Sequence, residues 1–144
     1  MTRFSSGGLL SLPVRLHGIA LGRPVDLILE PHTMRLLGFE VRCGDDARRF
    51  LPFAAARIGL EDIAIASPLL LLDELPFYRA QGRSLQALRG ARVRTGGAEA
   101  GALKDVLVGA DGKIERLLVS GPAGEREVLV DGGVRLEEPR APAA

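Results

Sequence analysis

Apolar and polar residues alternate with a period of two over several short stretches in the first half of the chain. Residues 24–30 and 34–43 place apolar side chains at every second position, and residues 60–66 do so over a shorter run. This period is typical of β-strands with one face in a core and the other in solvent. Turn-forming sequences at 30–33 and 43–46 separate the runs. We therefore expect about five short antiparallel strands and no long helix in this half.

The sequence RRFLPF (48–53) is predicted as an edge strand of this group. Its apolar residues suit a strand that faces a core, but Pro52 cannot donate a main-chain hydrogen bond and is typical of sheet edges and bulges. Arg48 and Arg49 come just before. On this interpretation they solvate the flank and protect the edge from pairing with other chains.

The second half of the chain repeats the plan of the first. VDLIL at 25–29 returns as KDVLV at 104–108, 79 residues later, and RRFLPF at 48–53 aligns with EREVLV at 125–130, 77 residues later. Internal repetition at a nearly constant spacing indicates two copies of one structural unit. The predicted organisation is a first repeat over 1–66, a Leu- and Arg-rich linker over 67–84, a second repeat over 85–138 and a flexible tail over 139–144.

The order of these motifs resembles the PRC-barrel family. The closest matches are RRFLPF (48–53) and DVLVGADGKIERLLV (105–119). The family's fold is a small, strongly bent antiparallel β-barrel, found in the photosynthetic reaction-centre H subunit, in ribosome maturation factors and in small stand-alone proteins. The resemblance implies an all-β protein with two such barrels in tandem, joined by the Leu-rich linker. It also implies a protein-binding module without catalysis, because the family's motifs specify a fold rather than a chemistry.

Composition narrows the classes of partner. The 144 residues carry a net charge of +1, so no global field attracts nucleic acid, and no DNA partner is expected. Aromatic residues are only 4% of the chain, which leaves few platforms on which bases could stack. The longest apolar run is far shorter than the roughly 20 residues of a membrane span. We expect no transmembrane segment and a cytoplasmic protein.

No motif of catalysis, cofactor binding or metal binding stands out. His17 and His32 are the only histidines, without the spacing of a metal site, and Cys43 is the only cysteine. Cys43 falls on the predicted core face, where a lone cysteine usually behaves as a small hydrophobic residue. We therefore expect no catalytic residue, no cofactor and no metal.

The linker contains four consecutive leucines, Leu69, Leu70, Leu71 and Leu72. A small strand cannot bury all of them. One interpretation is that they hold the two barrels together, since barrels of this size bury too little surface to be stable alone. The other main interpretation is an exposed patch for docking a partner. A contact with a membrane surface is the third.

Phe77 and Tyr78 stand at the start of a basic segment, because residues 75–98 contain five arginines and no acidic residue. The arginines are Arg79, Arg83, Arg89, Arg92 and Arg94. Aromatic residues beside arginines can bind RNA or an acidic protein surface. The plainer interpretation is that these are ordinary solvated arginines, since 17 of the 19 basic residues in the chain are arginine.

The leading function is a non-enzymatic protein-interaction or scaffolding module that uses the leucines, the two aromatic residues and the arginines of the linker region. The alternative is an RNA- or ribosome-associated assembly or maturation factor that uses the arginine cluster at 79–94. An enzyme is the third class, and no convergent set of polar residues favours it. The sequence leaves the identity of the partner and the oligomeric state open, a homo-oligomer included.

Overall fold

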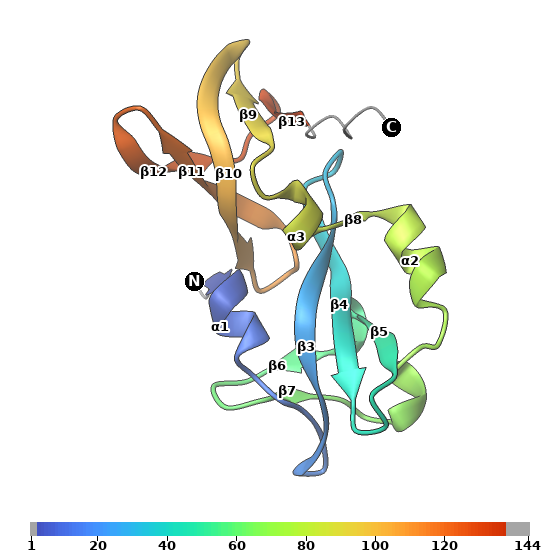
Figure 1. The fold of residues 1–144 in the computed structure, drawn as a ribbon. Helices are drawn as coiled ribbons and strands as arrows, with labels where there is room; N and C mark the ends of the chain where they lie inside the picture. The colour runs from blue at the N-terminus through green and yellow to red at the C-terminus, as the bar shows by residue number, and fades with distance from the viewer. Residues whose placement is uncertain (1–2, 138–144) are drawn as a thin grey trace.

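The computed structural model describes residues 3–137, and its architecture is mainly β, as the sequence predicts (Figure 1). Two sheets divide the strands between them. The first sheet has the order β5-β4-β3-β2-β7-β6, with strands Arg48–Pro52, Arg35–Cys43, Ile19–Glu30, Val14–Leu16, Ile63–Ala64 and Arg57–Ile58. The second has the order β12-β11-β10-β9-β13, with strands Gly124–Leu129, Ile114–Gly121, Ala98–Gly109, Arg92–Thr95 and Val134–Glu137. Neighbouring strands are antiparallel except for the short parallel pair β2–β7.

Short helices interrupt the strands, which the sequence analysis did not predict. They are α1 (Ser6–Leu10), α2 (Leu75–Gln81), α3 (Leu85–Leu88) and the 3-10 helices η1 (Phe53–Ala55) and η2 (Pro68–Leu70). Serine side chains start two of them: Ser5 Oγ accepts from the Gly8 N–H at 3.0 Å, and Ser84 Oγ accepts from the Ala87 N–H at 3.1 Å. Such caps satisfy amide groups that a first helical turn leaves unpaired. Helices this short have no periodicity to detect.

The long strands β3 and β10 form the centre of each sheet, and both bend at bulges. Glycine permits close strand contact at corresponding positions, 79 residues apart. A Cβ added to Gly22 would lie 2.5 Å from the Arg42 carbonyl oxygen, and one added to Gly101 would lie 2.5 Å from the Ser120 carbonyl oxygen. Gly101 also has a φ of +137°, which side-chain-bearing residues rarely adopt. Both halves therefore need glycine where their long strand crosses its neighbour most closely.

Each half contributes a short strand to the other half's sheet. β1 (Arg3–Ser5) pairs with β10, with Phe4 opposite Val108, and β8 (Arg83–Ser84) pairs with β3, with Arg83 opposite Leu29. The β3–β4 and β10–β11 turns also bind one another. The Leu36 N–H donates to the Gly112 carbonyl and the Ile114 N–H donates to the Met34 carbonyl, both at 2.8 Å. Main-chain hydrogen bonds thus join the halves in both directions.

One apolar core extends through both halves. Leu27, Phe39 and Val41 from the first sheet and Leu117 and Val119 from the second are fully buried and belong to the same cluster. The alternation of the sequence correctly placed these side chains on core-facing positions. Because the cluster is continuous and backbone pairing crosses the junction, the two sheets pack as one body.

The two closed barrels expected from the family resemblance are not observed. Among residues 3–137 the sheets are open, since β5 and β6 end one and β12 and β13 end the other without pairing. Each long strand takes part of its pairing from the opposite half instead of curling back onto its own. The predicted linker over 67–84 contains η2, α2 and β8, and the predicted tail over 139–144 lies outside the described residues. No helix among the described residues has the length and hydropathy to cross a membrane.

Candidate functional site

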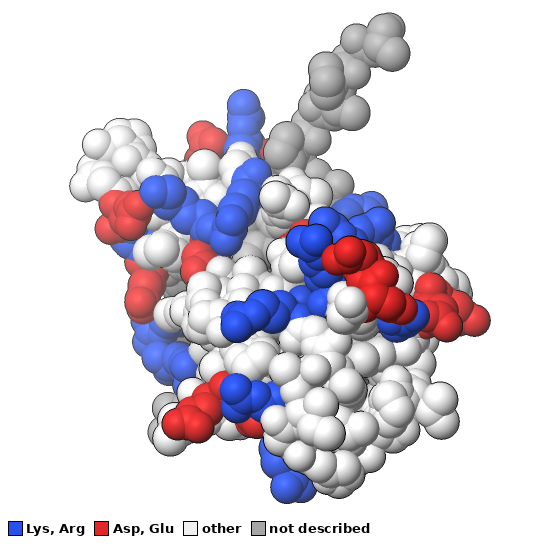
Figure 2. All heavy atoms as spheres, turned by 60° about the horizontal axis from the view of Figure 1, so that its bottom comes forward, with Lys and Arg blue, Asp and Glu red and all other residues white. Residues whose placement is uncertain are grey.

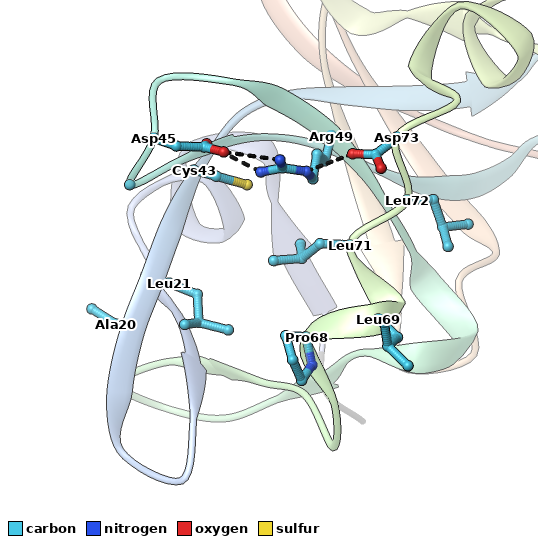
Figure 3. Close-up of a pocket in the computed structure, with 11 residues that line it drawn as sticks. Ala20, Leu21, Cys43, Asp45, Arg49, Pro68, Leu69, Leu71, Leu72 and Asp73 are labelled. Atoms are coloured by element: carbon cyan, nitrogen blue, oxygen red, sulfur yellow. Dashed lines mark hydrogen bonds and ion pairs between the residues drawn. The ribbon is translucent and has the colours of Figure 1, made fainter.

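A hollow of about 600 Å³ opens at the lower end of the first sheet (Figure 3). Its walls come from the start of β3, the end of β4 with the following turn, and residues 67–73. We call residues 67–73 the strap. Figure 3 shows Leu21 of β3 and Leu71 of the strap facing one another across the hollow, with Pro68 and Leu69 at its lower rim. The floor and sides are therefore largely aliphatic.

The strap is fixed to the edge of the first sheet by main-chain hydrogen bonds. The Leu72 N–H donates to the Phe50 carbonyl at 2.8 Å, and the Phe50 N–H donates to the Leu72 carbonyl at 2.9 Å. Ser67 starts η2 by accepting the Leu69 N–H at 3.1 Å. Pro68 occupies the first helical turn, where a missing N–H is tolerated. The sequence therefore both shapes the strap and covers the edge of β5.

Arg49 connects the two walls of the hollow. Its guanidinium binds both oxygens of Asp45, at 3.1 and 2.9 Å, and its Nε donates to Asp73 Oδ1 at 2.7 Å (Figure 3). Hydrogen bonding from Arg49 lowers the pKa of Asp45. In turn Asp45, then the Cys43 sulfur and Asp73, raise the pKa of Arg49. The two carboxylates stay largely exposed and give the rim of the hollow an excess of negative charge.

The four leucines of the strap have different surroundings. Leu69 is 83% exposed, whereas Leu70 and Leu71 are partly buried against the main core. Leu72 packs on the opposite side, against the small cluster of Ile28, Phe50 and Leu75. All four lie along the first sheet. The junction between the halves is formed elsewhere, by β1, β8 and the two paired turns.

Helix α2 covers the outer face of the first sheet. Tyr78 stacks on Phe50 with ring centroids 4.1 Å apart, and Phe77 meets Tyr78 edge-on at 5.2 Å. Arg79 Nε donates to Glu40 Oε1 at 2.9 Å, and its Nη2 contacts the same oxygen. Glu40 is 3% exposed and its other oxygen accepts from Arg48 at 2.7 Å. Tyr78 and Arg79 thus hold α2 in place, and Phe77, 55% exposed, is the aromatic ring of α2 that faces solvent.

The remaining arginines of the predicted cluster are spread over three elements. Arg83 lies on β8, where its Nη1 donates to the Gly82 carbonyl at 2.9 Å. Arg89, after α3, donates to the Lys104 carbonyl at 3.2 Å and to Ser6 Oγ at 3.4 Å. Arg92 and Arg94 lie on β9 and pair with Glu99 at 3.7 Å and Glu137 at 2.6 Å. Figure 2 shows basic and acidic side chains next to one another on the face it presents, around a broad uncharged area.

Sequence reasoning missed the charged residues that shape the site. Asp45 and Asp73 were interpreted as solvated turn residues and Arg49 as a flanking charge, but the fold joins them. Glu40 was placed on the solvent face of its strand, and α2 buries it. The closeness of Asp45 and Arg49 in one hairpin was a local signal. Asp73 and Arg79 had none, because their partners lie 24 and 39 residues away.

The other candidates for chemistry stay apart. Cys43 is buried, as its position in the strand predicted. Over residues 3–137 no group of three or more His, Cys, Asp and Glu side chains could hold a metal ion. A scan of the sequence against protein-family models finds no match, and a search of curated proteins finds none either. The geometry of the hollow is therefore the main basis for a functional proposal.

Proposed function

We propose that this chain is a non-enzymatic protein-interaction or scaffolding module, and that a partner docks in the hollow beside the strap. The observation that carries the proposal is the exposure of Leu69, at 83%, on the rim of a largely aliphatic hollow. An aliphatic side chain held in solvent beside other apolar groups marks a contact surface, because covering it removes apolar area from water.

The shape and charge of the hollow suit an aliphatic side chain of the partner, inserted between Leu21 and Leu71. Asp45 and Asp73 at the rim favour a basic residue next to that side chain. The Arg49 network fixes the walls before the partner arrives, which reduces the entropy lost on binding.

The proposal includes an evolutionary part: the two halves are copies of one PRC-barrel-type unit that have opened and exchanged strands. Corresponding elements support it, since Phe4 pairs with Val108 at the position where Arg83 pairs with Leu29. A family of binding modules fits the absence of a convergent polar set among the residues described.

RNA binding is the alternative, and the arginines argue against it. Arg79, Arg92 and Arg94 each form an ion pair with a carboxylate of the same chain. Neutralising phosphates would require several of these pairs to break, and few exposed aromatic rings are present to stack bases.

A photo-crosslinker tests the proposal. A benzophenone side chain is placed at position 69, and irradiation in the native lysate is expected to give a defined protein adduct that survives ribonuclease. The matched control places the same group at Leu60, which is 101% exposed and does not line the hollow. Substituting Leu71→Asp should remove the adduct from position 69. An adduct that ribonuclease abolishes favours the RNA alternative, and equal adducts from positions 60 and 69 contradict the docking site.

A further inference from the structure

The strand β12 forms an edge of the second sheet with unpaired main-chain groups. Its register with β11 is regular, and the Val130 N–H donates to the Glu115 carbonyl at 2.9 Å. In an antiparallel pair, alternate residues bond to the neighbour and the others point away. The N–H and C=O groups of Glu125, Glu127 and Leu129 therefore face outward. Nothing in residues 3–137 pairs with that side of β12, and Figure 1 shows the β11–β12 hairpin projecting from the molecule.

The corresponding edge in the first sheet shows what such an edge accepts. Phe50 occupies the position in β5 that Glu127 occupies in β12, because they lie opposite Glu40 and Leu118, which are 78 residues apart. Phe50 exchanges two hydrogen bonds with Leu72 of the strap, antiparallel to β5. An extended segment of a few residues is thus sufficient to cover this type of edge.

The side chains of β12 select the chemistry of such a segment. Glu125 and Glu127 lie on the outer face of the sheet together with Leu129, which is 58% exposed. One oxygen of Glu125 binds Lys104 at 2.5 Å, and one oxygen of Glu127 lies 3.6 Å from Arg116. The second oxygen of each carboxylate is open to a further donor. Cross-strand neighbours of opposite charge stabilise a sheet, and like charges destabilise it.

A second copy of this chain does not fit the edge. Hydrogen-bonded pairing of two β12 strands requires outward-facing residues to lie opposite outward-facing residues. A pair centred on Glu125 or Glu127 places that glutamate against its own copy. A pair centred on Arg126 places Glu125 against Glu127 twice. Each of these registers opposes like charges.

We propose that β12 is a docking edge for an extended segment of a partner protein, which adds as an antiparallel strand. The segment carries basic residues opposite Glu125 and Glu127 and an aliphatic residue opposite Leu129. An acidic residue between the two basic ones lies beside Arg126, which has no hydrogen bond or ion pair with any described residue. The proposal extends the interaction function to the second sheet, but β12 shares no residue with the hollow, so either can fail alone.

The probe is the peptide acetyl-Thr-Ile-Val-Lys-Asp-Lys-Thr-amide, whose two lysines match Glu125 and Glu127 in the antiparallel register. We expect a dissociation constant on the order of 100 μM, as for a short strand with few anchors. Amide hydrogen exchange measured by NMR should show Glu125, Glu127 and Leu129 unprotected in the free protein and protected with the peptide. Arg126 and Val128, already bonded to β11, should change little.

Two changes to the peptide and one to the protein sharpen the result. N-methylation of the first lysine removes the N–H that would bond to Glu127 and should abolish protection. The variant Glu125→Lys/Glu127→Lys should bind the peptide at least about tenfold more weakly. A peptide with both lysines replaced by glutamate should bind that variant and not the wild type. This exchange of charge separates docking from misfolding, because a misfolded variant binds neither peptide.

Several outcomes overturn the proposal. Protection of the three amides in the free monomer means that part of this chain already covers the edge. A dimer in sedimentation equilibrium that the double variant dissociates assigns the edge to a second copy. No protection at about 1 mM peptide, or binding that is equal for both peptides, excludes a charge-selected strand. The variant Leu69→Asp should leave peptide binding unchanged, which distinguishes failure here from failure at the hollow.

Discussion

The edges of the two sheets contrast most clearly at β5 and β12. The first is covered, because the strap pairs with Phe50 and Asp73 binds Arg49. The second exposes three outward-facing residues, and nothing in the described part of the chain covers them. Sheet edges are sites of unwanted pairing unless they are covered or charged. The chain uses a covering segment at one edge and acidic side chains at the other.

The outer faces of the sheets show the same contrast. In the first sheet, α2 lies over Glu40 and Phe50, and Arg79 supplies the charge that permits a buried carboxylate. The corresponding positions in the second sheet are Leu118 and Glu127, without a helix over them among residues 3–137. A buried glutamate needs an ion-pair partner, whereas a leucine does not. Side-chain identity therefore follows the covering element rather than the strand pattern.

The largest expected effect tests whether the two sheets share one core. Phe39→Ala should lower the free energy of unfolding by about 3–5 kcal/mol, and Leu117→Ala by about 2–5 kcal/mol, because each leaves a cavity at a fully buried position. Both variants should unfold in one transition in urea, followed by far-UV circular dichroism and by the fluorescence of Tyr78. Separate transitions for the two signals would mean that the halves fold independently.

The paired glycines provide the next effect. Gly22→Ala should destabilise by about 1–3 kcal/mol, because its Cβ meets a carbonyl oxygen of the backbone. Gly101→Ala should reach the upper end of that range because it adds a φ of +137°. Gly132→Ala is the matched control, with nothing within 4 Å of the added Cβ. Urea denaturation provides the values. A Gly101 variant as stable as the control would contradict the equivalence of the two strands.

The strands and core were predictable from the sequence, because alternation is a local property. The pattern placed Leu27, Phe39 and Val41 in the core, and RRFLPF as an edge strand at β5. Pro52 and the arginines gave that edge away before any contact was known. The family resemblance suggested closed barrels, which the open sheets do not show.

The cross-half contacts were not predictable, for a physical reason. The strands β1 and β8 are three and two residues long, too short to show a period, and each pairs across the junction. At the site, the leucines were recognised as a feature. Their environments differ because Leu69 faces solvent and Leu72 faces α2, which depends on how the strap lies. Arg79 was assigned to a basic cluster because its partner, Glu40, lies in a distant strand.

Proline substitutions compare the covered and the open edge directly. Leu72→Pro removes the N–H that donates to Phe50, and Leu71 already has the extended conformation that proline requires of its predecessor. We expect it to be about 1–2 kcal/mol less stable than Leu72→Ala, the control for lost packing. Glu127→Pro removes an N–H with no partner and should destabilise by less than about 1 kcal/mol. Equal losses from the two prolines in thermal unfolding would show that β12 is also covered.

The smallest effect concerns the corresponding aspartates Asp26 and Asp105. Burial, with a contribution from nearby Glu40, raises the pKa of Asp26, against hydrogen bonds from the Leu27 and Gln86 amides and the charge of Arg89. The folded chain thus holds this proton more tightly than the unfolded chain, so the stability of the wild type falls as pH rises through the raised pKa. Asp26→Asn keeps an oxygen acceptor and removes the charge.

We therefore expect Asp26→Asn to be at least as stable as the wild type at pH 7, with its advantage shrinking as the pH is lowered toward the ordinary value of 3.8. Melting temperatures across this range provide the measurement. Asp105→Asn is the matched control, since Asp105 also accepts the N–H of the next residue but lies opposite Leu118 rather than a glutamate. If Asp26→Asn is less stable than the wild type by a constant margin at every pH, the carboxylate stabilises this face through its hydrogen bonds, and burial beside Glu40 is not what distinguishes the two sheets.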